Sequence, residues 1–226
     1  MVSWVLKPFP IGDAASPERD YRLIRISLSD GSALFLRMAY LIPLWPGDAM
    51  RVPGWELSAE EGEALQYAAR CFHAERAALR LVARAEQCRA VLARKLAVRG
   101  YPGPCVAAAI AYLDVVDLVN DGRYARLWLT YHVSHGARSP RALFQGLCRR
   151  GLPQDTIKAA LQAVLDPELE GRLLRRFLQK TRRQSKKQSQ TSATLKRTLR
   201  FEGFSPALIA RLLEEERFQE LCSQSP

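Results

Sequence analysis

Residues 147–152 read LCRRGL, and the same pattern occurs at 96–101 (LAVRGY) and at 199–204 (LRFEGF). Each stretch contains a leucine, two variable residues, a charged residue, a glycine and a bulky apolar residue. The glycines Gly100, Gly151 and Gly203 stand 51 and 52 residues apart. A nearly constant interval of this length is typical of a chain built from repeated structural units.

Apolar residues also recur at fixed offsets on both sides of each glycine. The matching sets are Leu92, Leu143 and Leu195; Leu96, Leu147 and Leu199; Val106, Ile157 and Ile209; and Ile110, Leu161 and Leu213. Such spacings put apolar residues on one face of a helix before the glycine and of another helix after it. A glycine just past a helix end can adopt the left-handed conformation that turns the chain back. Each stretch therefore predicts a helix-turn-helix corner.

A further helical stretch precedes each corner, at 79–85, 124–132 and 173–180. Each repeat is then a unit of three helices, which stacks on its neighbours because it cannot bury its apolar face alone. We expect tandem three-helix repeats at 58–118, 119–166 and 167–226, arranged in an elongated array. Ser58 and Glu61 form a capping-box signature at the first helix, while Ser139-Pro140 and Ser205-Pro206 mark later helix starts.

The N-terminal residues 1–57 show a different pattern. Apolar residues alternate with polar ones at 24–29, Asp30-Gly31 follows, and a second apolar run covers 33–38. Period-two alternation around an Asp-Gly pair predicts a β-hairpin. Prolines and glycines between Pro43 and Gly54 predict a loop at a domain boundary. The predicted fold class is therefore mainly α, with a small N-terminal β-hairpin.

The formal net charge of +11 arises in one part of the chain. Eleven Lys and Arg residues and no Asp or Glu lie between Arg172 and Arg200, and the remaining 23 basic residues equal the 23 acids. Such a block indicates contact with a polyanion or an acidic protein surface. The candidate partner- or DNA-binding residues are Arg149, Arg150, Arg172, Arg175, Arg176, Lys180, Arg182, Arg183, Lys186, Lys187, Lys196, Arg197 and Arg200.

Polar residues between these cations suit contacts with phosphates, which carry no sequence information. Aromatic residues are scarce near the block, with Phe177 and Phe201 the nearest, so we expect no readout of bases there. The alternative is a solvated loop that joins two helices of the third repeat.

Signatures of catalysis are absent from the sequence. It contains no G-x-x-x-x-G-K-[ST], G-x-S-x-G or G-x-G-x-x-G motif. The five cysteines lack zinc-site spacing and are expected to be free core residues, and His132 and His135 lack a nearby third ligand. We therefore expect no catalytic, cofactor-binding or metal-binding residues and no enzymatic activity. Without a membrane span or a secretory signal pattern, a cytoplasmic location is expected.

Several stretches resemble the RecX family of bacterial recombination regulators. They are ALRLVAR at 78–84, AVLARKLAVRGY at 90–101, LVNDGRYARLWL at 118–129 and SPRALFQGLCRRGL at 139–152. The chain departs from the family pattern at Cys88, Val91, Asn120 and Gly146. Gly146 lies inside a predicted helix and is expected to cost about 1 kcal/mol relative to Ala.

The resemblance implies a monomeric, non-enzymatic modulator that binds the RecA filament on single-stranded DNA, lodges in its helical groove and usually lowers its activity. Inhibition is favoured over activation, and binding at filament ends remains an alternative to binding along the groove. A second hypothesis is an independent DNA-binding protein that acts through the basic block between Arg172 and Arg200, which we call the basic segment. A third is a scaffold for another acidic protein.

Overall fold

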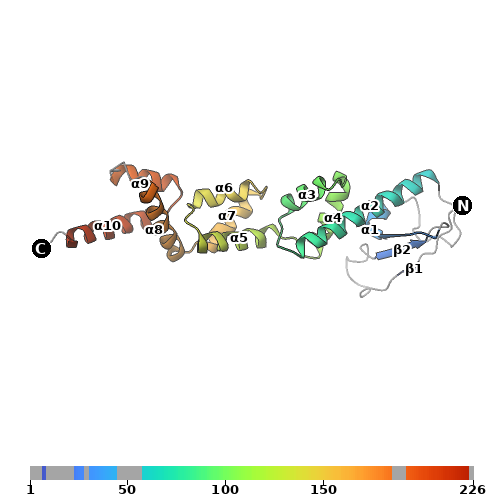
Figure 1. The fold of residues 1–226 in the computed structure, drawn as a ribbon, viewed down its shortest axis with the longest axis horizontal. Helices are drawn as coiled ribbons and strands as arrows, with labels where there is room; N and C mark the ends of the chain where they lie inside the picture. Colours follow the sequence, from blue (N-terminus) through green and yellow to red (C-terminus); the bar gives the residue numbers. More distant parts are fainter. Residues whose placement is uncertain (1–6, 9–22, 28–30, 45–57, 185–191, 224–226) are drawn as a thin grey trace. The chain divides into compact units, whose positions relative to one another are not determined.

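The computed structural model describes residues 7–8, 23–27, 31–44, 58–184 and 192–223 (Figure 1). The chain divides into two compact units, residues 1–120 and 121–226, which are described in turn. Ten α-helices and a small sheet lie within the described ranges, and the mainly helical fold class is confirmed. None of the helices in these ranges combines the length and apolar character needed to cross a membrane.

A three-stranded antiparallel sheet opens the first unit. Strands β1 (Lys7–Pro8), β2 (Leu23–Ser27) and β3 (Ala33–Arg37) follow one another across the sheet. Ile24 pairs with Leu36 and Ile26 with Leu34, and Gly31 has a φ of 84° in the connecting turn. The predicted hairpin is confirmed, and β1 adds an edge strand that the sequence pattern did not predict.

Two short helical segments follow the hairpin at once, beginning at Met38, the last residue of the predicted second apolar run. They are α1 (Met38–Leu41) and the 3-10 helix η2 (Ile42–Leu44). Tyr40 and Leu41 of α1 are buried, because this turn faces the long helix α2 (Ala59–Val82). Most of the predicted loop between Pro43 and Gly54, from residue 45 on, lies outside the described residues.

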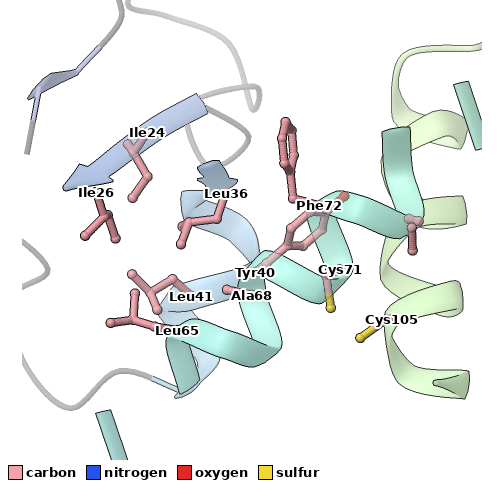
Figure 2. Packing of buried hydrophobic residues seen from close by; sticks show 12 residues of the cluster. Ile24, Ile26, Leu36, Tyr40, Leu41, Leu65, Ala68, Cys71, Phe72 and Cys105 are labelled. Carbon is pink, nitrogen blue, oxygen red and sulfur yellow. The ribbon is translucent and has the colours of Figure 1, made fainter. Parts of the chain in front are cut away.

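The core of the first unit lies between the hairpin and α2 (Figure 2). Ile24, Ile26 and Leu36 from the sheet face Leu65 and Phe72 of α2. The small residues Ala68, Cys71 and Ala74 of α2 belong to the same core. The buried thiols of Cys71 and Cys105 point toward one another between α2 and α4 (Gly103–Val115), and both are free cysteines (Figure 2).

A buried carboxylate ties the hairpin to α2. Glu75 is fully buried and accepts hydrogen bonds from Arg37 Nε at 2.6 Å, Arg37 Nη2 at 2.7 Å and the Tyr40 hydroxyl at 2.9 Å. The Arg37 guanidinium also lies 3.9 Å from the ring centroid of Tyr112 on α4. A buried charge is tolerated when such a set of donors replaces its water.

Helix α2 and the eight helices after it form three-helix repeats, as predicted. The eight are α3 (Arg89–Val98), α4, α5 (Asp121–His135), α6 (Pro140–Cys148), α7 (Gln154–Val164), α8 (Pro167–Gln184), α9 (Ser192–Phe201) and α10 (Pro206–Ser223). The four-part division of the chain and the elongated stacking of the repeats stay predictions.

All three predicted corners have the same geometry. Gly100 and Gly151 have a φ of 84° and Gly203 of 85°, so each occupies the left-handed region. At the first corner Tyr101 N–H donates to Leu96 O at 3.3 Å and Gly100 N–H to Ala97 O at 2.9 Å. The other two corners repeat this pair of bonds, which define a Schellman motif. The repeated stretch is therefore a helix C-cap that closes each turn.

Candidate nucleic-acid and partner interface

Helix α8 is polarised along its length. Its first turn carries Glu168 and Glu170, whereas its second half carries four of the six predicted cations that lie in this helix. Acidic residues are favourable near a helix N-terminus and basic residues near its C-terminus. The basic end of α8 is therefore compatible with the helix itself as well as with an anionic partner.

Two predicted site residues line a cleft of about 260 Å³ between α8 and α10. Arg175 Nη2 lies 3.1 Å from Glu215 Oε2, and Arg211 Nε lies 3.1 Å from Glu215 Oε1. Hydrogen bonds from both arginines lower the pKa of Glu215 below its usual value. Arg172 lies 3.7 Å from Glu168. Glu215 and Glu168 thus neutralise part of the charge that Arg175 and Arg172 would offer a partner.

Arg176 has a contact inside the protein. Its Nη1 donates to Ser134 O at 2.8 Å and to Gly136 O at 3.2 Å. These carbonyls lie at the C-terminal end of α5, where backbone acceptors lack helical partners. Arg176 therefore joins the third repeat to the second, whatever else it binds.

The remaining predicted cations of the third repeat are more accessible. Lys180 on α8 is exposed, and so are Lys196, Arg197 and Arg200 on α9. Arg182 and Arg183 lie in the last turn of α8, while Lys186 and Lys187 lie outside the described residues. Besides Arg172 and Arg175, which lie beside carboxylates, four predicted cations of this repeat therefore have exposed side chains on two helices.

The arginine pair at the second corner splits between two environments. Arg149 is exposed, whereas Arg150 is half-buried. Arg150 Nε donates to the Tyr124 hydroxyl at 3.2 Å, and its Nη1 donates to Gly146 O at 2.9 Å. The guanidinium also lies 4.8 Å from the ring centroid of Trp128. Arg150 therefore packs α6 on α5.

Gly146 has a packing role that the sequence analysis did not predict. A Cβ atom there would lie 2.7 Å from Cη2 of Trp128 and 3.2 Å from Cζ2. The glycine makes room for the indole, so the propensity cost assigned to it is offset by packing between α5 and α6.

The joint between the second and third repeats was missed by the sequence analysis. Ser139 Oγ donates to the Glu202 carboxylate, and Arg141 N–H donates to Glu202 O at 3.0 Å. The Arg141 guanidinium lies 3.7 Å from the ring centroid of Phe201. The third corner is therefore bonded to the start of α6. The charge pattern alone gave no signal for these contacts.

A row of rings on α5 was also missed. Trp128 and His132 have centroids 4.0 Å apart, and Tyr131 stacks on His135 at 4.8 Å. Burial, together with Arg138 and Arg150 nearby, lowers the pKa of His132. In the described part of the chain no three His, Cys, Asp or Glu side chains are grouped as a metal site would need.

Comparisons with known proteins agree with this repeat architecture. Residues 120–161 match a family model described as RecX, second three-helix domain. "Regulatory protein RecX" of Treponema pallidum (strain Nichols) is 34% identical over 157 residues, which cover 70% of this chain and 93% of the relative. "Regulatory protein RecX" of Mycobacterium avium (strain 104) is 34% identical over 86 residues, 38% of this chain and 50% of that protein.

Two solved structures have a similar fold. A crystal structure of regulatory protein RecX aligns with a TM-score of 0.68 at 18% identity, covering 95% of this chain and 100% of the other. RecX from Lactobacillus salivarius aligns with a TM-score of 0.54 at 20% identity, covering 65% of this chain and 96% of the other.

Proposed function

Because this chain belongs to the RecX family of regulatory proteins, we propose that it binds the RecA filament on single-stranded DNA and lowers the recombinase, ATPase and coprotease activities of that filament. In this proposal it acts as a cytoplasmic monomer, through contacts rather than catalysis, and needs no cofactor.

The observation that carries the proposal is the extent of the relationship to a curated regulator. The alignment at 34% identity spans 93% of the relative from Treponema pallidum, so nearly the whole of that protein has a counterpart here. The motifs at 78–152 resemble the RecX pattern, and this resemblance is the reason for proposing the RecA filament as the partner.

The exposed cations of the third repeat support an electrostatic contribution to binding of the RecA filament. Lys180, Lys196 and Arg200 project into solvent, and none of them takes part in an ion pair among the described residues. Such cations would meet DNA phosphates or acidic side chains in the filament groove, and phosphate contacts gain free energy from the release of counterions. Arg176 would contribute by holding the second and third repeats together.

The repeats suggest how a non-enzymatic protein lowers the activity of the filament. Consecutive three-helix units would contact neighbouring RecA protomers at once. A chain that bridges two protomers in one arrangement opposes the shifts between them that accompany ATP hydrolysis, since it binds one arrangement more tightly than the other.

The test is the single-stranded-DNA-dependent ATPase activity of RecA during titration with this protein. We expect the ATPase rate to fall when well below one molecule of this protein is present per RecA protomer. A fall only in excess, parallel to coverage of bare DNA, would mean competition for DNA. An unchanged rate at every ratio contradicts the proposal.

Independent DNA binding through the basic segment is the second candidate function. The run of eleven Lys and Arg residues without an acid between Arg172 and Arg200 favours it. About seven phosphate contacts would weaken affinity by orders of magnitude between roughly 50 and 200 mM salt. Recognition through packed helices would weaken much less, so the salt dependence of binding to the filament separates the two candidates.

A further inference from the structure

Helix α5 presents a continuous set of rings at the surface of the second unit. Trp128 packs on His132 with centroids 4.0 Å apart, and His132 meets the edge of Tyr131 at 5.2 Å. Tyr131 in turn stacks on His135 at 4.8 Å with 27° between the ring planes. We call these four side chains the ring face.

The outer part of the ring face is open to solvent. Tyr131 is 61% exposed, a large fraction for an aromatic residue on a folded helix, and His135 is exposed as well. Trp128 is half-buried against Gly146, so it supports the ring face from the inner side. Core packing therefore accounts for Trp128 but not for Tyr131.

Two arginines lie beside the ring face, in a part of the sequence that has no acidic residue. Between Gly122 and Gln154 the chain has six arginines and no Asp or Glu. The guanidinium of Arg138 lies 5.8 Å from the Trp128 ring centroid and that of Arg150 lies 4.8 Å from it. Arg138 is exposed and forms no ion pair in the described part of the chain. A ligand with both planar rings and negative charge fits this combination.

We propose that the ring face binds single-stranded nucleic acid by stacking bases on Tyr131 and His135, while Arg138 contacts the adjacent phosphates. Proteins that bind single strands without sequence preference combine aromatic rings with a positively charged surface in this way. Duplex bases are already stacked on one another and cannot use the ring face. The surface belongs to the second repeat and is distinct from the basic segment of the third.

The inference goes beyond the proposed regulation of RecA, and its test contains no RecA. If the ring face does not bind single strands, the RecA ATPase titration can still succeed. If the RecA ATPase rate is unchanged, the ring face can still bind single strands. The full-length protein is titrated into labelled oligothymidylate of about 15 nucleotides and into an abasic strand with the same number of phosphates, and fluorescence anisotropy measures affinity. An oligouridylate of equal length shows whether DNA or RNA is preferred.

Replacing Tyr131 by Ala should weaken binding to oligothymidylate roughly fivefold or more, which is the lower end of the effect of losing one stacked base. The same variant should bind the abasic strand as the native protein does. Tyr131→Phe keeps the ring and should keep native affinity. Leu127→Ala is the matched control, because Leu127 is 55% exposed on the same helix and has no ring.

His135→Ala gives an independent check, since it removes the ring that stacks on Tyr131. It should show the same selective loss on strands that carry bases. Circular dichroism confirms that the helices persist in each variant. Equal losses on the abasic and base-containing strands, an unchanged affinity of Tyr131→Ala, or an equal effect on a duplex would each overturn the proposal.

Discussion

The indole of Trp128 occupies the space that a side chain at position 146 would need, with its Cη2 atom 2.7 Å from the Cβ position of Gly146. Contacts between carbons at that separation are strongly repulsive. The indole also packs on His132, with centroids 4.0 Å apart, and lies 4.8 Å from the Arg150 guanidinium, so moving it would disturb these contacts. Helices α5 and α6 therefore pack through a large residue matched to a glycine.

This relationship predicts an unusual response to Gly146→Ala. In an unhindered helix interior the change stabilises by about 1 kcal/mol, but overpacking typically costs about 1–3 kcal/mol. We expect a net loss of about 1 kcal/mol in the native protein and a gain of about 1 kcal/mol in a Trp128→Ala background. Urea unfolding of the four proteins measures both values.

Gly171→Ala on α8 is the matched control, because no atom beyond its chain neighbours and the nearby backbone of its own helix lies within 4 Å of its Cβ position. It should stabilise the protein by about 1 kcal/mol with or without Trp128. Equal effects of Gly146→Ala in both backgrounds would show that the two positions are not coupled.

The first corner allows a test of backbone strain without steric interference. Gly100 and Gly103 both have open space around their Cβ positions, but only Gly100 has a positive φ, 84°. Gly100→Ala should lower the free energy of unfolding by about 1–2 kcal/mol, the cost of a left-handed L-residue. Gly103→Ala should show no such loss. Thermal and urea unfolding of the two variants check the difference, and equal stabilities would contradict the role assigned to the Schellman glycine.

Tyr40 should make the stability of the protein sensitive to alkaline pH. Burial, the Glu75 charge and the hydrogen bond to Glu75 raise its pKa above the usual value of 10. Above about pH 10 the unfolded chain loses this proton while the folded chain keeps it, so stability falls as pH rises. At pH 8 the group is protonated in both states and its contribution is complete.

Tyr40→Phe should therefore cost about 1 kcal/mol near pH 8, through loss of its hydrogen bond, and its deficit should shrink toward about pH 11. Urea unfolding at the two pH values measures the change. Tyr131→Phe, which removes the hydroxyl of an exposed tyrosine, is the control variant. A deficit that stays constant with pH would mean that Tyr40 does not titrate between the two states in this way.

Arg176 and Lys180 lie one helical turn apart, and both were predicted from charge alone to bind a partner. Arg176→Gln should lower stability by about 1.5–3 kcal/mol, because its charged hydrogen bonds to Ser134 O and Gly136 O are lost. Lys180→Gln should leave stability unchanged within about 0.5 kcal/mol, as is usual for surface substitutions. Calorimetric unfolding distinguishes them; similar losses in both variants would contradict the structural role of Arg176.

Local rules explain why the corners could be predicted from the sequence. A glycine after a helix, apolar residues at fixed offsets and a Ser-x-x-Glu cap act over a few residues, so their effects are readable along the chain. The Arg37–Glu75 pair spans 38 residues, and no local pattern selects which buried carboxylate an arginine will meet. The fit of Trp128 to Gly146 depends likewise on how two helices pack.

Candidate site residues were predicted less completely, because net charge does not distinguish a cation that binds a partner from one that holds the fold. Arg150 and Arg176 belong to the basic set but have contacts inside the protein. Arg175 shares Glu215 with Arg211 on α10. Conversely, the ring face combines cations with aromatic residues, and its signal was the acid-free stretch 122–154, whose six arginines are fewer than the eleven cations between Arg172 and Arg200.

The basic segment provides the last prediction. A variant in which five cations of the basic segment are replaced by Gln should lose affinity for the filament, or for single-stranded DNA, while its fold stays intact. The changed residues are Lys180, Arg182, Arg183, Lys186 and Lys187. Each lost phosphate contact with a single strand reduces the slope of log affinity against log salt by about 0.7, so five contacts would remove about 3.5 from the slope.

A matched variant carries five Gln substitutions at exposed arginines of the first unit, which changes the net charge equally. Its positions are Arg70, Arg76, Arg80, Arg84 and Arg94. If affinity depended on net charge alone, both variants would weaken equally. We expect the segment variant to lose most of the salt dependence and the matched variant to keep it, because counterions are released only where a cation contacts a phosphate. Native affinity and slope in the segment variant would remove residues 180–187 from the interface and leave the other exposed cations of the predicted set, among them those of α9, as candidates.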